Sequence, residues 1–127
     1  MATIAQRHRS EAIRVQVTIL VELVPADLDL YSNIIVWLYY DNSQVLGKYS
    51  RETLTGHNTA DFDVIDAAEG RFDILIQPSL TIPQNVDTIT MEVQVRKEDE
   101  DFENETWRRI VTYVTVVKLI DALTKSI

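Results

Sequence analysis

The segment 97–106 carries the densest group of side chains that could bind a cation. Its carboxylates are Glu98, Asp99, Glu100, Asp101, Glu103 and Glu105. Carboxylates at alternating positions are suitable ligands for Ca²⁺, but an EF-hand loop also needs a central glycine, and this segment has none. We therefore predict no metal site. The segment is expected to form a solvated hairpin tip, and its functional alternative is an electrostatic contact with a basic neighbour.

Three further carboxylates, Asp61, Asp63 and Asp66, lie close together in the sequence. Asp61 and Asp63 are two positions apart, so in a strand both point to the same face. That face is opposite Phe62 and Val64, and we expect it to be exposed to solvent. Charged side chains there also discourage pairing with the strands of other chains.

The two histidines offer little support for catalysis. His8 lies near the N-terminus and His57 in a polar segment, and no motif supplies a partner for either. The sequence also lacks a glycine-rich phosphate loop and a Gly-x-Ser-x-Gly motif. We therefore expect no catalytic residue, no cofactor and no small-molecule substrate, and we predict that the chain is not an enzyme.

Length and composition favour one folded domain. The chain has 127 residues, of which 46% are hydrophobic and 25% are charged. Its formal net charge of −8 argues against nucleic acid as a partner, because phosphate binding requires clustered lysine and arginine. There is no cysteine, so disulfides, thiolate zinc sites and cysteine nucleophiles are excluded.

The most apolar stretch near the N-terminus is not expected to enter a membrane. It covers residues 13–24 and is interrupted by Arg14, Gln16 and Glu22. No signal peptide is apparent, because the basic residues before it are not followed by a suitable apolar segment. We therefore expect no membrane partner.

The clearest elements that could position these side chains form a hairpin over residues 61–76. Apolar residues alternate with polar ones on both sides of a short link. These apolar residues are Phe62, Val64, Phe72, Ile74 and Ile76. Asp66 begins the link and Gly70 ends it, which suits a type I turn followed by a residue with positive φ.

Alternation predicts five further strands, over residues 13–23, 34–40, 45–50, 88–96 and 107–119. In the first of these strands, every second residue from Ile13 to Leu23 is expected to face the core. Pro25 ends the strand. About seven short strands separated by turn signals indicate an all-β protein. We predict a single immunoglobulin-like antiparallel β-sandwich over residues 12–119.

The two ends of the chain lie outside this predicted sandwich. Residues 1–11 form an N-terminal arm containing Arg7 and Arg9, which is either a frayed terminus or an arm that docks on an acidic neighbour. Residues 120–127 form a C-terminal tail or a short helix, because the apolar residues near the end have helix-like spacing. Those residues are Leu119, Ile120, Leu123 and Ile127.

The strand 34–40 has apolar residues on both faces. Such a strand is either covered twice or presents one face to a partner. Ile35, Trp37 and Tyr39 share one face, and we take them as candidate interface residues. With Tyr40 and Tyr49 these aromatic residues could also bind sugar rings.

Two runs, 27–38 and 66–72, carry a resemblance to a known family. The first reads Asp-Leu-Asp-Leu-Tyr-Ser-Asn and continues into the alternating Ile-Ile-Val-Trp-Leu, and the second reads Asp-Ala-Ala-Glu-Gly-Arg-Phe. They resemble the Asp-Leu-Ser-Gly turn with its following strand, and the Asp-Ala-x-x-Gly-x-hydrophobic hairpin, of small immunoglobulin-like modules. These modules occur in baseplate and tail-fibre proteins of tailed bacteriophages, and the N-terminal domain of upper-baseplate proteins is an example.

The resemblance implies a structural protein of a phage virion, made in the host cytoplasm. Its partners would be other virion proteins and copies of itself, in the tail, baseplate, fibre-attachment or connector region. Head decoration and carbohydrate binding are the alternatives. The candidate interface comprises Arg7, Arg9, Ile35, Trp37, Tyr39, Leu119, Ile120, Leu123 and Ile127, with the carboxylates of the segment 97–106 as an electrostatic contact.

Overall fold

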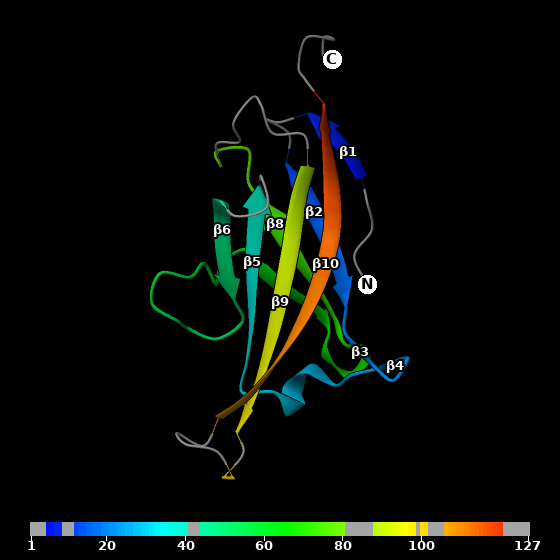
Figure 1. Cartoon of the computed structure of the whole chain (residues 1–127), viewed down its shortest axis with the longest axis vertical. Coiled ribbons are helices and arrows are strands. Elements are labelled where there is room, and N and C mark those ends of the chain that lie inside the picture. Colours follow the sequence, from blue (N-terminus) through cyan, green and yellow to red (C-terminus); the bar gives the residue numbers. More distant parts are fainter. Residues whose placement is uncertain are drawn as a thin grey trace.

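The computed structural model describes residues 5–8, 12–40, 44–80, 88–98, 100–101 and 106–120. The described chain is all-β and contains sheets of five, three and two strands, with two short 3₁₀ turns (Figure 1). This confirms the all-β class that the alternation of apolar residues predicts.

The five-stranded sheet has the order β1-β10-β9-β5-β6. Its strands are β1 (Ala5–His8), β10 (Thr106–Ile120), β9 (Thr88–Glu98), β5 (Asn33–Tyr40) and β6 (Gln44–Ser50). Strand β1 runs parallel to β10, and the other neighbours are antiparallel. The long β9–β10 hairpin extends to the lower end of the molecule in Figure 1.

The three-stranded sheet has the order β2-β8-β7, with β2 (Ile13–Thr18), β8 (Arg71–Ile76) and β7 (Phe62–Asp66). A separate small hairpin follows β2 and consists of β3 (Leu20–Val21) and β4 (Val24–Pro25). The two 3₁₀ turns, η1 (Leu28–Leu30) and η2 (Ala67–Glu69), lie against each other.

One cluster of buried side chains joins the two larger sheets. Its members are Ile13, Val15, Val17, Ile19, Leu28, Ile34, Val36, Leu38, Tyr49, Phe62, Phe72, Ile74, Ile76, Ile89, Met91, Val93 and Val95. Within it the rings of Phe62 and Phe72 are stacked, with centroids 4.5 Å apart and planes 10° from parallel. The two sheets therefore share one hydrophobic core.

The hairpin predicted over residues 61–76 is confirmed as β7, η2 and β8. Asp66 Oδ1 accepts a hydrogen bond from the Glu69 N–H at 3.4 Å, and Gly70 has φ 72°. Asp66 and Gly70 therefore take the turn roles expected of them. Glycine adopts the left-handed conformation after a 3₁₀ turn most easily, because it has no Cβ atom.

Gly70 also joins this hairpin to the chain around β3 and β4. The Ile19 N–H donates to the Gly70 carbonyl oxygen at 2.9 Å, and the Ala26 N–H donates to the Ile19 carbonyl oxygen at 2.9 Å. A Cβ atom at Gly70 would lie 2.7 Å from the carbonyl oxygens of both Ala26 and Ile19. The backbone segments meet so closely that only glycine fits.

The prediction of one long strand over residues 13–23 is wrong in its second half. Strand β2 ends at Thr18, and the chain reverses at Glu22 and Leu23, which have φ 53° and 68°. Val21 and Leu23 are 36% and 88% exposed instead of buried. The alternation of apolar residues continues past Thr18 in the sequence. The pairing with β8 nevertheless ends there, where the Ile19 N–H donates to Gly70 and the Ile19 carbonyl oxygen accepts from the Ala26 N–H.

The described residues form ten strands rather than about seven. Part of the increase comes from the small hairpin after β2. The rest comes from the N-terminal arm, because residues 5–8 pair with β10 as an edge strand instead of fraying. The C-terminal tail or helix was predicted over residues 120–127, but Ile120 belongs to strand β10 together with Leu119. The rest of that segment, residues 121–127, lies outside the described residues, as does Arg9.

Tyr49 is the buried ionisable side chain of the core. It is 3% exposed, and a Cβ atom at Gly47 would lie 3.0 Å from its ring. Burial raises the pKa of Tyr49 to about 12, and the nearby charge of Asp61 adds to this. The folded state therefore favours the neutral form of the Tyr49 phenol.

The raised pKa of Tyr49 predicts a loss of stability in strong alkali. The unfolded phenol ionises near pH 10, so the stabilising effect is complete below that pH and is lost as the pH rises towards about 12. We expect the free energy of unfolding to fall by about 2 kcal/mol more in the wild type than in Tyr49→Phe over this interval. Urea denaturation of both proteins at about pH 8 and about pH 12 measures the difference. Equal losses in the two proteins would show that another group is responsible.

Candidate functional site

The face of β5 proposed as an interface is partly closed. Ile35 has no exposed area, and its cross-strand neighbours Ser50 and Gln94 are also buried. Ile35 is therefore corrected from a candidate interface residue to a buried one. Trp37 and Tyr39 are half-buried and remain available for contact.

The chain itself covers part of Trp37. The ring of His57 meets the indole edge-on, with centroids 5.8 Å apart and planes at 79°. His57 is held there because its Nδ1 lies 3.3 Å from the Tyr49 carbonyl oxygen, and Asn58 forms a bridge with Tyr49 at the edge of β6. On the same face, burial raises the pKa of Tyr39, and the charge of Glu92 adds to this.

The acidic segment is only partly described. Glu98, Glu100 and Asp101 are exposed, while Asp99, Glu103 and Glu105 lie outside the described residues. Among the described residues, no three histidine, aspartate or glutamate side chains are grouped closely enough to hold a metal ion. The segment follows the end of β9, as expected of a hairpin tip, and its electrostatic role stays a prediction.

An ionic cluster on the three-stranded sheet was not anticipated. Arg14 Nη1 donates to Asp73 Oδ2 at 2.7 Å and to Asp63 Oδ2 at 3.3 Å. Asp63 and Asp73 are direct cross-strand partners, an arrangement that is unfavourable for like charges unless a cation lies between them. The pKa of Arg14 is raised by its bond to Asp73 and then by its bond to Asp63.

Asp73 is the unusual member of this cluster, because its side chain is only 3% exposed. Its Oδ1 atom is buried and has no hydrogen-bond partner within the described part of the chain. Alternation along β8 places Asp73 on the face opposite Phe72 and Ile74. The partnership with Arg14 could not be predicted, because it depends on the register of β2 against β8 and of β8 against β7.

The small hairpin carries the two large apolar side chains that have the highest exposed fractions among the described residues. Leu23 is 88% exposed and Val24 is 63% exposed, and Leu30 in the adjoining η1 is 62% exposed. We refer to residues 21–24 as the β3–β4 tip. Sequence alternation had placed Val21 and Leu23 in the core. The sequence signal for this tip is that the apolar residues Val21 and Leu23 flank Glu22 shortly before Pro25.

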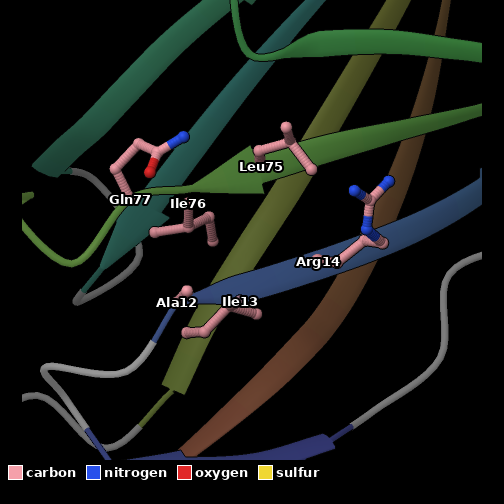
Figure 2. A pocket seen from close by; sticks show the side chains of 6 residues that line it. All are labelled: Ala12, Ile13, Arg14, Leu75, Ile76 and Gln77. Atoms are coloured by element: carbon pink, nitrogen blue, oxygen red, sulfur yellow. The ribbon is translucent and has the colours of Figure 1, made fainter.

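A hollow lies at the opposite end of the three-stranded sheet, where β2 begins and β8 ends. Figure 2 shows that each strand end contributes three of its residues, which are Ala12, Ile13, Arg14, Leu75, Ile76 and Gln77. Its volume is about 220 Å³. We refer to it as the β2–β8 hollow. Four of its six residues are apolar, and the other two are Arg14 and Gln77.

Comparisons of the chain with protein-family models, with curated proteins and with solved structures find no match. Within the described ranges, no helix has the length and apolar character needed to cross a lipid bilayer.

Proposed function

We propose that this chain is a non-enzymatic structural protein of a tailed-phage virion and that it acts through protein–protein contacts. The observation that carries the assembly role is the exposure of Leu23 and Val24 on a projecting hairpin. Apolar side chains at such a tip favour burial against another protein. The phage setting is supported by the family resemblance of the runs 27–38 and 66–72.

The proposed fold is an immunoglobulin-like antiparallel sandwich with added strands. Its support is the shared core between the five-stranded and three-stranded sheets, together with the hairpin at Gly70. In this proposal the partners are other virion proteins and copies of the chain, in the tail, baseplate, fibre-attachment or connector region. Trp37, Tyr39 and the acidic segment after β9 supply further contacts.

Particle composition tests this proposal. Tailed particles purified from the producing host should contain the chain at a fixed ratio to the other virion proteins, measured by quantitative mass spectrometry. Immunogold labelling with an antibody against the chain should mark the tail or baseplate. Particles that lack the chain would contradict the proposal, and labelling of the capsid would favour head decoration.

Carbohydrate binding is the second candidate, and the half-buried Trp37 and Tyr39 beside His57 are the observation that favours it. A glycan array probed with the purified chain separates the two functions. We expect no sugar to bind. Binding that is lost in Trp37→Ala but kept in Leu23→Ala would replace the assembly role with sugar recognition.

A further inference from the structure

The β3–β4 tip has a conformation that its own side chains do not favour. Strands β3 and β4 are joined by a loop of two residues, Glu22 and Leu23, whose φ angles are 53° and 68°. A hairpin of this kind forms most easily with Asn-Gly, because most residues with a Cβ atom are strained at positive φ. The strained loop holds Leu23 in solvent at 88% exposure, beside Val24 at 63%. A partner that buries these two side chains gives the loop a function that joining two strands does not require.

The side chains around the tip are mostly acidic. The segment 19–31 contains Glu22, Asp27 and Asp29, and it has no lysine, arginine or histidine. The segment 66–70 lies against it, because η1 contacts η2, and it adds two carboxylates and no basic residue. The apolar tip therefore projects from an end of the molecule that is rich in negative charge (Figure 1).

Two arginines offset only part of this charge. Arg51 donates to Asp29 at 2.6 Å, and Arg71 is the cross-strand partner of Asp66 at the end of β7. Even with both of these carboxylates neutralised, others remain. They are those of Glu22, Asp27 and Glu69.

The remaining charge selects the kind of partner. Nucleic acids and the anionic surfaces of cell membranes carry negative charge, so the carboxylates around the tip would be repelled from them. A second copy of the chain is also disfavoured, because each copy has a net charge of −8. The complementary surface is therefore a protein surface that is apolar at its centre and basic around it.

The hollows of this chain that contain a basic residue do not offer such a surface. In the β2–β8 hollow, Arg14 is bonded to Asp63 and Asp73. Lys97 lines another hollow, together with two carboxylates. In both places on the described surface, carboxylates offset the positive charge, so a different protein fits the tip better.

We propose that the β3–β4 tip inserts into an apolar pocket of another virion protein and that lysine or arginine side chains surround this pocket. Leu23 is the central anchor, and Val24 extends the apolar contact. Glu22 and the neighbouring carboxylates form ion pairs at the rim. This inference rests on the proposed assembly function and names the chemistry of the partner.

Competition for places in the particle measures the contribution of Leu23. Wild type and Leu23→Asn are produced in equal amounts in the host, and mass spectrometry of purified particles counts both forms by the peptide that carries the substitution. The variant should be under-represented at least about 10-fold, because it lacks the apolar anchor. It should melt no lower than the wild type, because asparagine adopts positive φ more readily than leucine. Val45→Asn is the matched control, since Val45 is 44% exposed on β6, and it should be incorporated like the wild type.

The same competition tests the basic rim. Glu22→Lys reverses the charge beside the anchor and should be under-represented about 3-fold or more. Gln44→Lys places the same side chain at an exposed position of β6 and should compete equally with the wild type. Equal incorporation of Glu22→Lys would show that the partner surface is not basic.

A cross-link identifies the neighbour of the tip. p-Benzoylphenylalanine in place of Val24 puts a photoreactive apolar side chain next to Leu23. Irradiation of the particles should join it to a different virion protein, at a site flanked by lysine or arginine. A cross-link to another copy of this chain would overturn the proposal.

Two further results would also overturn it. One is equal incorporation of Leu23→Asn and wild type into particles. The other is binding of the wild type, but not of Leu23→Asn, to phosphatidylcholine vesicles, which would assign the tip to a lipid surface. In each case the wild type would still be present in particles if the assembly function holds. Particles that lack the wild type would contradict the assembly function itself, so the two failures can be told apart.

Discussion

Replacing Gly70 by alanine should lower the free energy of unfolding by about 4 kcal/mol, enough to unfold a substantial fraction of a marginally stable domain. An alanine Cβ would lie 2.7 Å from two backbone carbonyl oxygens, those of Ala26 and Ile19. The Ile19 oxygen accepts a hydrogen bond from the Ala26 N–H, and the Ile19 N–H donates to Gly70, so a shift of the Ile19 backbone would disturb both bonds. The left-handed φ of 72° adds a further cost for any residue with a Cβ atom. Urea denaturation followed by circular dichroism measures the loss.

Gly56→Ala is the matched control for this prediction. Gly56 also has a positive φ, 81°, but a Cβ atom there would meet nothing within 4 Å. Its substitution should cost only the backbone term, about 1 kcal/mol. The difference between the two variants therefore reports the close approach at Gly70. Equal losses would mean that the junction around Ile19 adjusts freely, and the role assigned to Gly70 would be wrong.

Replacing Phe72 by alanine should lower the free energy of unfolding by about 3–5 kcal/mol. Phe72 has no exposed area, and its ring stacks on Phe62 with centroids 4.5 Å apart. Truncation removes this contact and leaves a cavity between the two sheets, because close-packed neighbours relax only in part. Chemical denaturation measures the change, and the slope with denaturant should stay the same.

Ile65→Ala on the neighbouring strand β7 provides the comparison. Ile65 is 44% exposed, so its truncation should change the free energy of unfolding by less than about 1 kcal/mol. If Phe72→Ala were equally mild, the sheets would not share the core described here. Phe72→Leu should fall between the two alanine variants, since most of the apolar volume is kept.

Several predictions from the sequence are confirmed because they rest on interactions between residues that lie close together in the sequence. The hairpin at Asp66 and Gly70 was predictable from turn chemistry, and the strands around Ile34 and Ile89 were predictable from alternation. The phage setting and the partners stay predictions, since they rest on the resemblance.

The candidate interface was predicted only in part, for a reason that Ile35 illustrates. A strand that is apolar on both faces can be covered by a partner or by its own chain, and the sequence does not distinguish these cases. In the structure, Ile35 is buried among residues of β6 and β9 that are distant in sequence. Trp37 is partly covered by His57, which comes from a loop that no periodicity describes.

By itself, the sequence determined the class of the fold, most of its strands and the turn at Gly70, because period-two alternation and turn residues act over a few neighbouring positions. Only the tertiary structure decided that Asp73 is buried against Arg14, that Leu23 projects into solvent and that a hollow opens beside Ile13. Each of these depends on strand register and on backbone hydrogen bonds between segments far apart in the chain. A shift of one residue in the register of β2 against β8 would place Arg14 and Asp73 on opposite faces of the sheet.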